Sequence, residues 1–227
     1  MQINISPNSY FVFDLDDTLI FEVDFLKSAF KSISEKLHAD LRVSVYDEML
    51  DKFYAGENAF ESLVKRYSSK LPYLSVGWLL NEYHHHFPEL SAKEDALRFL
   101  CRLKDFGIPM GLLTDGQSLR QRNKIAAAGI EMFFSDIIIS EEFGSAKPDE
   151  RNYLHFVSKN PYANFFAVAD NTSKDFIVPQ ALGWTTICVR DCGKHIHSQS
   201  FSRKTLPDYI IGSFDDVEIC IPDLITA

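Results

Sequence analysis

Long apolar runs and clusters of basic residues are both missing from this 227-residue chain. No apolar stretch approaches the roughly 20 residues that a membrane-spanning helix needs. No Lys/Arg-rich run is present either, and the formal net charge is -9, so anionic partners would be repelled. We therefore expect neither a membrane protein nor a nucleic-acid-binding protein.

Cysteine is scarce, and the N-terminal segment lacks the features of an export signal. No two cysteines form a CxxC pair, and a chain of this length does not depend on disulfides, so we expect reduced thiols. The segment before Tyr10 has neither basic residues nor a long apolar run. These absences predict a cytoplasmic location. The four cysteines are Cys101, Cys188, Cys192 and Cys220.

Strand and helix patterns follow an order that is typical of a layered α/β fold. A short apolar strand is expected at 10–13, followed by a helical region at about 24–87 with four amphipathic segments. After Pro88 the two patterns alternate, which predicts parallel strands joined by helices. The expected helices are 93–106, 118–128, 148–158 and 173–182, and the expected strands are 109–113, 136–140, 164–169, 185–189 and 209–211.

Acidic and polar residues follow several of these strands at their carboxyl ends. Parallel strands bring such residues to one edge of the sheet, which is where open α/β sheets bind ligands. A lysine at the start of a later helix joins the set. In chain order the residues are Asp14, Asp16, Asp17, Thr114, Asp115, Gly116, Lys147, Asp170 and Asp175.

This combination of residue types suits the chemistry of a phosphoryl group. Clustered carboxylates bind Mg²⁺, and a carboxylate can also attack phosphorus to form an aspartyl-phosphate. A second carboxylate nearby can protonate the leaving oxygen and then activate water. A hydroxyl, backbone N–H groups and a lysine can hold the phosphate oxygens.

Four stretches carry a resemblance to a known family. FDLDDTL, LLTDG, SAKPD and VADNTSKDF are similar, in this order, to the four motifs of the haloacid dehalogenase superfamily. The resemblance implies a Rossmann-like three-layer core, with a parallel sheet, formed by residues 1–20 and 90–227. It also implies that residues 21–89 form an all-helical cap that closes over a substrate.

The resemblance assigns catalytic and metal-binding roles to four aspartates. It implies that Asp14 is the nucleophile and a Mg²⁺ ligand. Asp16 is implied as the general acid and base, with its backbone carbonyl on the metal. Asp170 is implied as a ligand, and Asp175 supports the metal from nearby. Asp17 stands where a glycine is often found.

The phosphate-binding set implied by the resemblance comes from two loops. Thr114 and Lys147 are implied to hold the phosphoryl oxygens, and Gly116 allows close approach of the backbone. Asp115 belongs to the same turn, although it is also the expected cap of the following helix.

The function implied is a Mg²⁺-dependent phosphatase for a small metabolite, such as a sugar phosphate or a nucleotide monophosphate. The members that cleave carbon–halogen bonds lack an acid at the position of Asp16. The presence of Asp16 here therefore favours cleavage of phosphate esters. A phosphomutase would share every core residue and stays open as an alternative. A phospho-aspartate receiver or an inactive binding module is a further alternative. Neither would hydrolyse phosphate esters efficiently, so an assay of turnover would distinguish them from a phosphatase.

The histidines are not expected to bind a metal. His84, His85 and His86 are consecutive, so their side chains point in different directions from a helix end. His195 and His197 are expected in a solvated loop.

Overall fold

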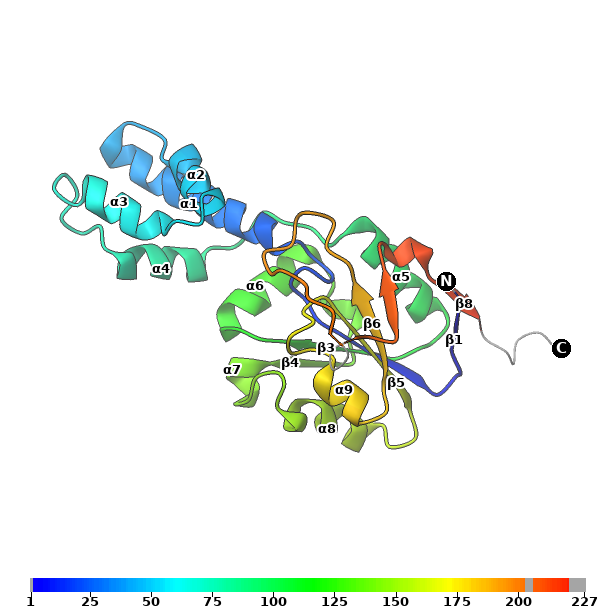
Figure 1. Cartoon of the computed structure of the whole chain (residues 1–227). Coiled ribbons are helices and arrows are strands. Elements are labelled where there is room, and N and C mark those ends of the chain that lie inside the picture. Colours follow the sequence, from blue (N-terminus) through cyan, green and yellow to red (C-terminus); the bar gives the residue numbers. More distant parts are fainter. Residues whose placement is uncertain (1, 203–205, 221–227) are drawn as a thin grey trace.

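The computed structural model describes residues 2–202 and 206–220 (Figure 1). A six-stranded sheet lies at its centre, and every neighbouring pair of strands is parallel. Among the described residues, no helix is both long and apolar enough to cross a membrane. The strands, in spatial order, are β4 (Asp136–Ile139), β3 (Met110–Thr114), β2 (Ser9–Phe13), β5 (Asn164–Ala169), β6 (Thr185–Val189) and β7 (Tyr209–Ile211).

Helices cover both faces of the sheet, so the expected three-layer α/β architecture is confirmed. All five residues of β2 are buried, as expected for a central parallel strand. Phe11 and Phe13 pack toward one helical layer, whereas Tyr10 and Val12 pack toward the other. The first layer contains α5 (Glu94–Asp105) and α6 (Ser118–Ala128), and the second contains α8 (Glu150–Lys159) and α9 (Ile177–Ala181).

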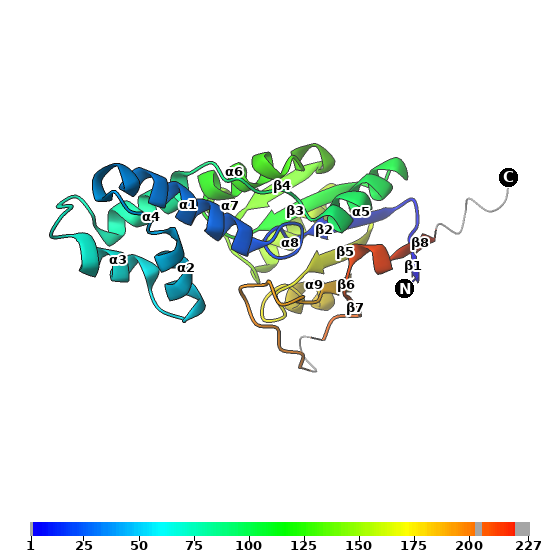
Figure 2. The same cartoon turned by 90° about the horizontal axis from the view of Figure 1, so that it is seen from above.

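Four helices between β2 and α5 form a separate body, which we call the helical insert. They bury an apolar cluster of their own that includes Phe30, Met49 and Leu63. Figures 1 and 2 show this insert projecting away from the sheet, to which the start of α1 and the chain after α4 connect it. The helices are α1 (Glu22–Leu41), α2 (Tyr46–Tyr54), α3 (Ala59–Tyr67) and α4 (Val76–His85).

Two features differ from the sequence-based expectation. The helix expected at 173–182 covers only Ile177–Ala181, because Asn171 accepts hydrogen bonds from the backbone and hydroxyl of Ser173 and forms a turn. A small second sheet, β1 (Gln2–Asn4) with β8 (Glu218–Cys220), was not expected from the short segments that form it. The remaining short elements are α7 (Ser140–Phe143), η1 (Glu131–Phe133) and η2 (Phe214–Asp216).

Candidate active site

Three neighbouring strands deliver polar side chains to one edge of the sheet. Asp14, Thr114 and Asp170 lie at or directly after the carboxyl ends of β2, β3 and β5, which are adjacent in the sheet. The backbone N–H of Asp14 still donates to Val168 on β5 at 2.9 Å, so the edge is held in register. All three polar residues are at most 9% exposed. The sheet therefore brings together residues that lie far apart in the sequence.

Lys147 occupies the centre of this edge. Its ammonium lies 2.6 Å from Oδ1 of Asp14 and 2.9 Å from Oδ1 of Asp175. Burial opposes the charged form, but the two carboxylates outweigh burial and raise the pKa of Lys147 well above its usual value. The loop before α8 therefore supplies a buried, permanent cation next to Asp14.

Asp14, Asp170 and Asp175 form a cluster in which one carboxylate oxygen from each residue lies within 4.8 Å of the other two. Burial and the neighbouring carboxylates raise the pKa of Asp170 to about 9 in the absence of a cation. Burial raises the pKa of Asp14 to about 7, although Lys147 acts against this shift. Oδ2 of Asp170 is buried without a hydrogen-bond partner among the described residues. An all-oxygen set with an unpartnered oxygen fits a hard divalent cation such as Mg²⁺.

Asp16 faces helix α6 instead of the carboxylate cluster. Its Oδ1 pairs with Lys124 at 2.7 Å, and its Oδ2 accepts a hydrogen bond from Gln121 at 3.0 Å. Burial favours the neutral acid, but these two partners outweigh it and lower the pKa of Asp16. Lys124 is completely buried, with its ammonium 4.5 Å from the centre of the Phe25 ring in the helical insert. Lys124 therefore links Asp16 to the helical insert.

The turn after β3 places the residues expected to bind phosphate. Thr114 accepts a hydrogen bond from Gln121 at 2.6 Å, which orients its hydroxyl. Gly116 adopts a φ of 143°, and a Cβ at this position would lie 2.8 Å from a guanidinium nitrogen of Arg120. Glycine is therefore favoured at this turn by its backbone conformation, whereas the end of the flexible Arg120 side chain could move away from an added Cβ.

Asp115 holds two lysine residues in place. Its Oδ1 accepts the backbone N–H of Lys147 at 3.0 Å, and its Oδ2 pairs with the ammonium of Lys174 at 2.7 Å. The expectation that Asp115 caps the next helix is wrong, because the residue that precedes α6 is Gln117. The side chain of Asp115 is engaged by these partners, so it positions the lysine loop at this edge.

The loop after β6 lies closer to the site than the sequence pattern suggests. The expectation of a solvated His195 is wrong, because its side chain is 0% exposed and lies 3.6 Å from Asp170. His197 does point to solvent, with 62% of its side chain exposed. Asp17 accepts the backbone N–H of Ile196 at 2.8 Å, and this bond pulls the loop onto the turn after β2.

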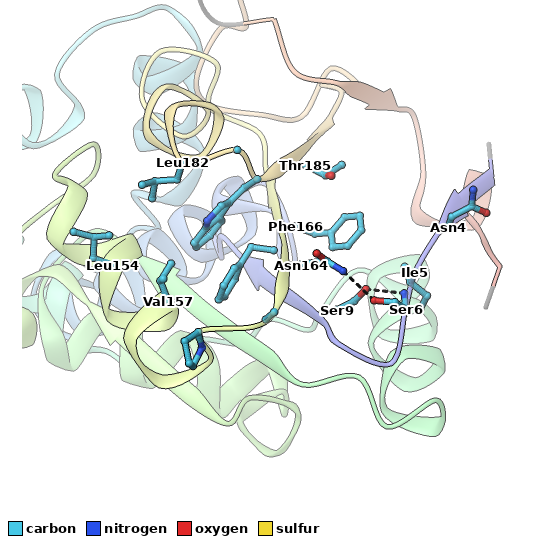
Figure 3. A pocket seen from close by; sticks show the side chains of 15 residues that line it. Asn4, Ile5, Ser6, Ser9, Leu154, Val157, Asn164, Phe166, Leu182 and Thr185 are labelled. Atoms are coloured by element: carbon cyan, nitrogen blue, oxygen red, sulfur yellow. Dashed lines mark hydrogen bonds between the residues drawn. The ribbon is translucent and has the colours of Figure 1, made fainter. Parts of the chain in front are cut away.

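A hollow of about 340 Å³ opens between α1 and this loop. Lys27 and Tyr54 line it from the helical insert, and Lys194 lines it from the loop. A larger hollow of about 530 Å³ lies at the opposite edge of the sheet (Figure 3), where Ser9, Asn164 and Thr185 begin their strands. None of the expected catalytic residues lines either hollow. Asp14, Lys147 and Asp175 line a much smaller space of about 10 Å³ at the carboxyl edge, and the first hollow is linked to that edge through the loop that carries His195.

Sequence reasoning missed Lys124 and Gln121. Both residues lie on the helix that follows the LLTDG turn, and they share a buried face with Ile125. Their spacing from Ile125 could have indicated that they face the strand ends. Buried lysine and glutamine residues are unusual unless they are paired, and here both are paired with Asp16.

Comparisons with known proteins found a matching family model, sequence relatives and similar folds. A family model described as haloacid dehalogenase-like hydrolase matches residues 11–189. The chain is 26% identical over 224 residues to a glyceraldehyde 3-phosphate phosphatase from Methanocaldococcus jannaschii, covering 94% of this chain and 96% of that protein. It is also 26% identical over 200 residues to a phosphoserine phosphatase from Thermus thermophilus, covering 71% and 80%. A Bacillus subtilis protein described as a HAD-hydrolase, solved with bound magnesium, has a similar fold, with a TM-score of 0.60 at 18% identity and coverage of 92% and 96%.

Proposed function

Because the chain belongs to the haloacid dehalogenase-like hydrolase family, we propose that it is a Mg²⁺-dependent phosphatase acting on a small phosphorylated metabolite. The observation that carries this proposal is the pairing of Asp14 with Lys147 at 2.6 Å, beside Asp170, at the carboxyl edge of the sheet. This arrangement supplies a nucleophile, a cation for the phosphate oxygens and oxygen ligands for a metal. Relatives named as phosphatases support hydrolysis over a mutase or a receiver.

The first proposed step is attack by a carboxylate oxygen of Asp14 on phosphorus, which forms an aspartyl-phosphate. Lys147 and Thr114 hold the phosphoryl oxygens, and Asp16 gives its proton to the leaving alkoxide. Lys124 keeps Asp16 ionised before substrate binds. A dianionic phosphate beside it raises the pKa of Asp16, because like charges disfavour ionisation, so Asp16 takes up a proton from solvent as substrate binds and holds it for the leaving oxygen.

In the second step, Asp16 has become a base and takes a proton from water. Water attacks phosphorus, inorganic phosphate leaves and the Asp14 carboxylate is restored. This role is consistent with the lowered pKa of Asp16, which makes the ionised form its resting state.

Asp14, Asp170 and the backbone carbonyl of Asp16 would hold Mg²⁺, with Asp175 supporting them. The ion would neutralise charge on the phosphate and reduce repulsion between the carboxylates. Asp175 forms an ion pair with Lys147, so its proposed contribution is to position Lys147 and the metal ligands.

The helical insert is the proposed cap over the substrate. Asn123 on α6 donates a hydrogen bond to the carbonyl of His86 at 3.2 Å, and Lys124 contacts Phe25. These contacts join the insert to α6, the helix that holds Asp16, and they support a cap whose closure would exclude water and large substrates. The relatives are named for glyceraldehyde 3-phosphate and phosphoserine, which are phosphorylated three-carbon compounds. The proposed substrates are therefore compounds of this kind, sugar phosphates and nucleotide monophosphates.

The test is phosphate release from a panel that contains glyceraldehyde 3-phosphate, phosphoserine, sugar phosphates, nucleotide monophosphates and p-nitrophenyl phosphate. Each compound is assayed with Mg²⁺ and again with excess chelator. The proposal predicts metal-dependent release with a preference for one class. If a folded, Mg²⁺-loaded protein released no phosphate from any compound, the proposal would be wrong.

A further inference from the structure

Asp17 and His195 lie buried beside Asp170 but have no part in the proposed reaction. Asp17 is 1% exposed and Asp170 is 2% exposed, and the side chain of His195 is completely buried. One ligand atom from each of the three residues lies within 4.8 Å of the other two. The turn after β2, the end of β5 and the loop after β6 therefore meet at one point.

The carboxyl groups at this point form no ion pair with a lysine or arginine of the described residues. Among the described residues, no lysine or arginine nitrogen lies within 4.0 Å of the carboxylate of Asp17 or Asp170. The nearby ammonium of Lys93 donates to the backbone carbonyl of Asp17, at 3.4 Å. Buried carboxylates without a counter-charge are costly, so a cation at this point would be stabilising.

His195 supplies the ligand type that the neighbouring carboxylate cluster lacks. Neither of its ring nitrogens has a hydrogen-bond partner within the part of the chain that the structure describes. Its Nδ1 lies 3.6 Å from Oδ2 of Asp170, a distance too long for a hydrogen bond. This Oδ2 has no hydrogen-bond partner among the described residues either. A neutral imidazole in this position offers one nitrogen lone pair to a metal.

The backbone around His195 is held in place before any ligand binds. Oδ1 of Asp191 accepts the N–H groups of Gly193, Lys194 and His195 at 2.7 to 3.0 Å. The next residue, Ile196, donates to Asp17 at 2.8 Å. These bonds fix the backbone of the loop, and the imidazole that it carries lies 3.6 Å from Asp170.

We propose that Asp17, Asp170 and His195 bind a second divalent cation of the kind that accepts nitrogen as well as oxygen, such as Mn²⁺, Co²⁺ or Zn²⁺. Mg²⁺ prefers oxygen ligands and belongs to the neighbouring carboxylate cluster. Asp170 is shared by the two sites, and ions in two-metal sites lie about 3.5–4 Å apart, a spacing that one carboxylate can span. The second cation joins the loop after β6 to the catalytic turn.

Equilibrium dialysis with Co²⁺ in the absence of Mg²⁺ tests this inference. The wild-type protein should bind two ions per chain, and His195→Ala should bind one. The dissociation constant of the lost site should rise by more than about 100-fold. Removing a residue that only hydrogen-bonds to a metal ligand costs roughly 10–100-fold in affinity. His197→Ala, which removes an exposed histidine from the same loop, is the matched control and should still bind two.

One bound ion in the wild-type protein, or two in His195→Ala, would overturn the inference. If His195→Ala fails to fold, the wild-type protein decides the question. Nitrogen-15 spectra should then show that Zn²⁺ shifts one imidazole nitrogen of His195, and unshifted nitrogens at saturation would reject the site. No substrate is used, so failure of the proposed phosphatase activity would leave this test unaffected.

Discussion

Asp14 and Asp16 are separated by one residue, yet their surroundings push their pKa values in opposite directions. Asp14 lies in the carboxylate cluster, and its pKa is raised to about 7 even though Lys147 is close. Asp16 points to Lys124 and Gln121, and its pKa is lowered. Two carboxyls in different surroundings can perform different tasks, here proposed as nucleophile and acid–base group.

Asp14→Asn tests the first of these roles. An amide is a poor nucleophile, so turnover of the preferred phosphate ester should fall by roughly 10⁴-fold or more. Asp175 still pairs with Lys147, so circular dichroism and thermal melting should show a folded protein. Steady-state phosphate release is the measurement, and near-normal turnover in the folded variant would exclude Asp14 as nucleophile.

Lys124→Met tests the control of Asp16. Loss of the ammonium raises the pKa of Asp16, so the pH profile of kcat/KM should move to higher pH, with a fall in rate of up to about 10²-fold. Arg122→Met on the same helix is the control, because Arg122 pairs with Glu142 away from Asp16. An unshifted pH profile in Lys124→Met would show that the ion pair has only a structural role.

At the scale of elements, close packing of strand β3 against helix α8 supports the carboxyl edge. A Cβ on Gly111 would lie 2.5 Å from a ring carbon of Phe156, so the strand and the helix approach too closely for any larger residue. Gly77 in α4 is different, because an added Cβ would meet only Ser75 Oγ at 3.9 Å. The two glycines therefore serve different purposes.

The two positions predict opposite effects on stability, measured by chemical denaturation. Gly111→Ala should lower the free energy of unfolding by about 1–3 kcal/mol through overpacking against Phe156. Gly77→Ala should raise the stability of α4 by up to about 1 kcal/mol, because alanine favours helix more than glycine does. Equal effects at both positions would contradict this account of the β3–α8 contact.

Elements with strong local patterns were predictable from the sequence, and those shaped by tertiary contacts were not. Asp14, Thr114 and Asp170 could be placed together because parallel strands bring their carboxyl ends to one edge. Lys124 and His195 could not, because their positions depend on how α6 and the loop after β6 pack around the strand ends. The division into a catalytic core and a closing cap remains a prediction.

Across the whole molecule, buried carboxyls whose pKa values are raised, mainly by burial, should make stability depend on pH and on metal. The pKa of Asp170 is raised to about 9, and those of Asp14 and Glu22 are raised to about 7. Unfolded carboxyls titrate near pH 4, so between about pH 4 and 9 the folded protein binds more protons than the unfolded chain. The free energy of unfolding of the metal-free protein should therefore fall as pH rises through this range.

Mg²⁺ should reverse this trend, because it replaces the protons on Asp14 and Asp170, which lie in the carboxylate cluster. The increase in melting temperature on adding Mg²⁺ should be larger at pH 8.5 than at pH 6. A cation present at 100 times its dissociation constant, and bound only by the folded state, adds about 2.7 kcal/mol. Asp170→Asn is the control and should lose most of the effect. The same Mg²⁺ shift at both pH values would argue against cation binding by the cluster.

The position of the phosphoryl group during turnover distinguishes attack by Asp14 from direct attack by water. The wild-type protein is mixed with its preferred substrate and Mg²⁺, quenched in acid within the first turnover, digested and analysed by mass spectrometry. The account predicts one added phosphoryl group on the peptide that carries Asp14, and none when a chelator replaces Mg²⁺. A phosphoryl group on any other residue, or rapid turnover with no labelled peptide, would contradict it.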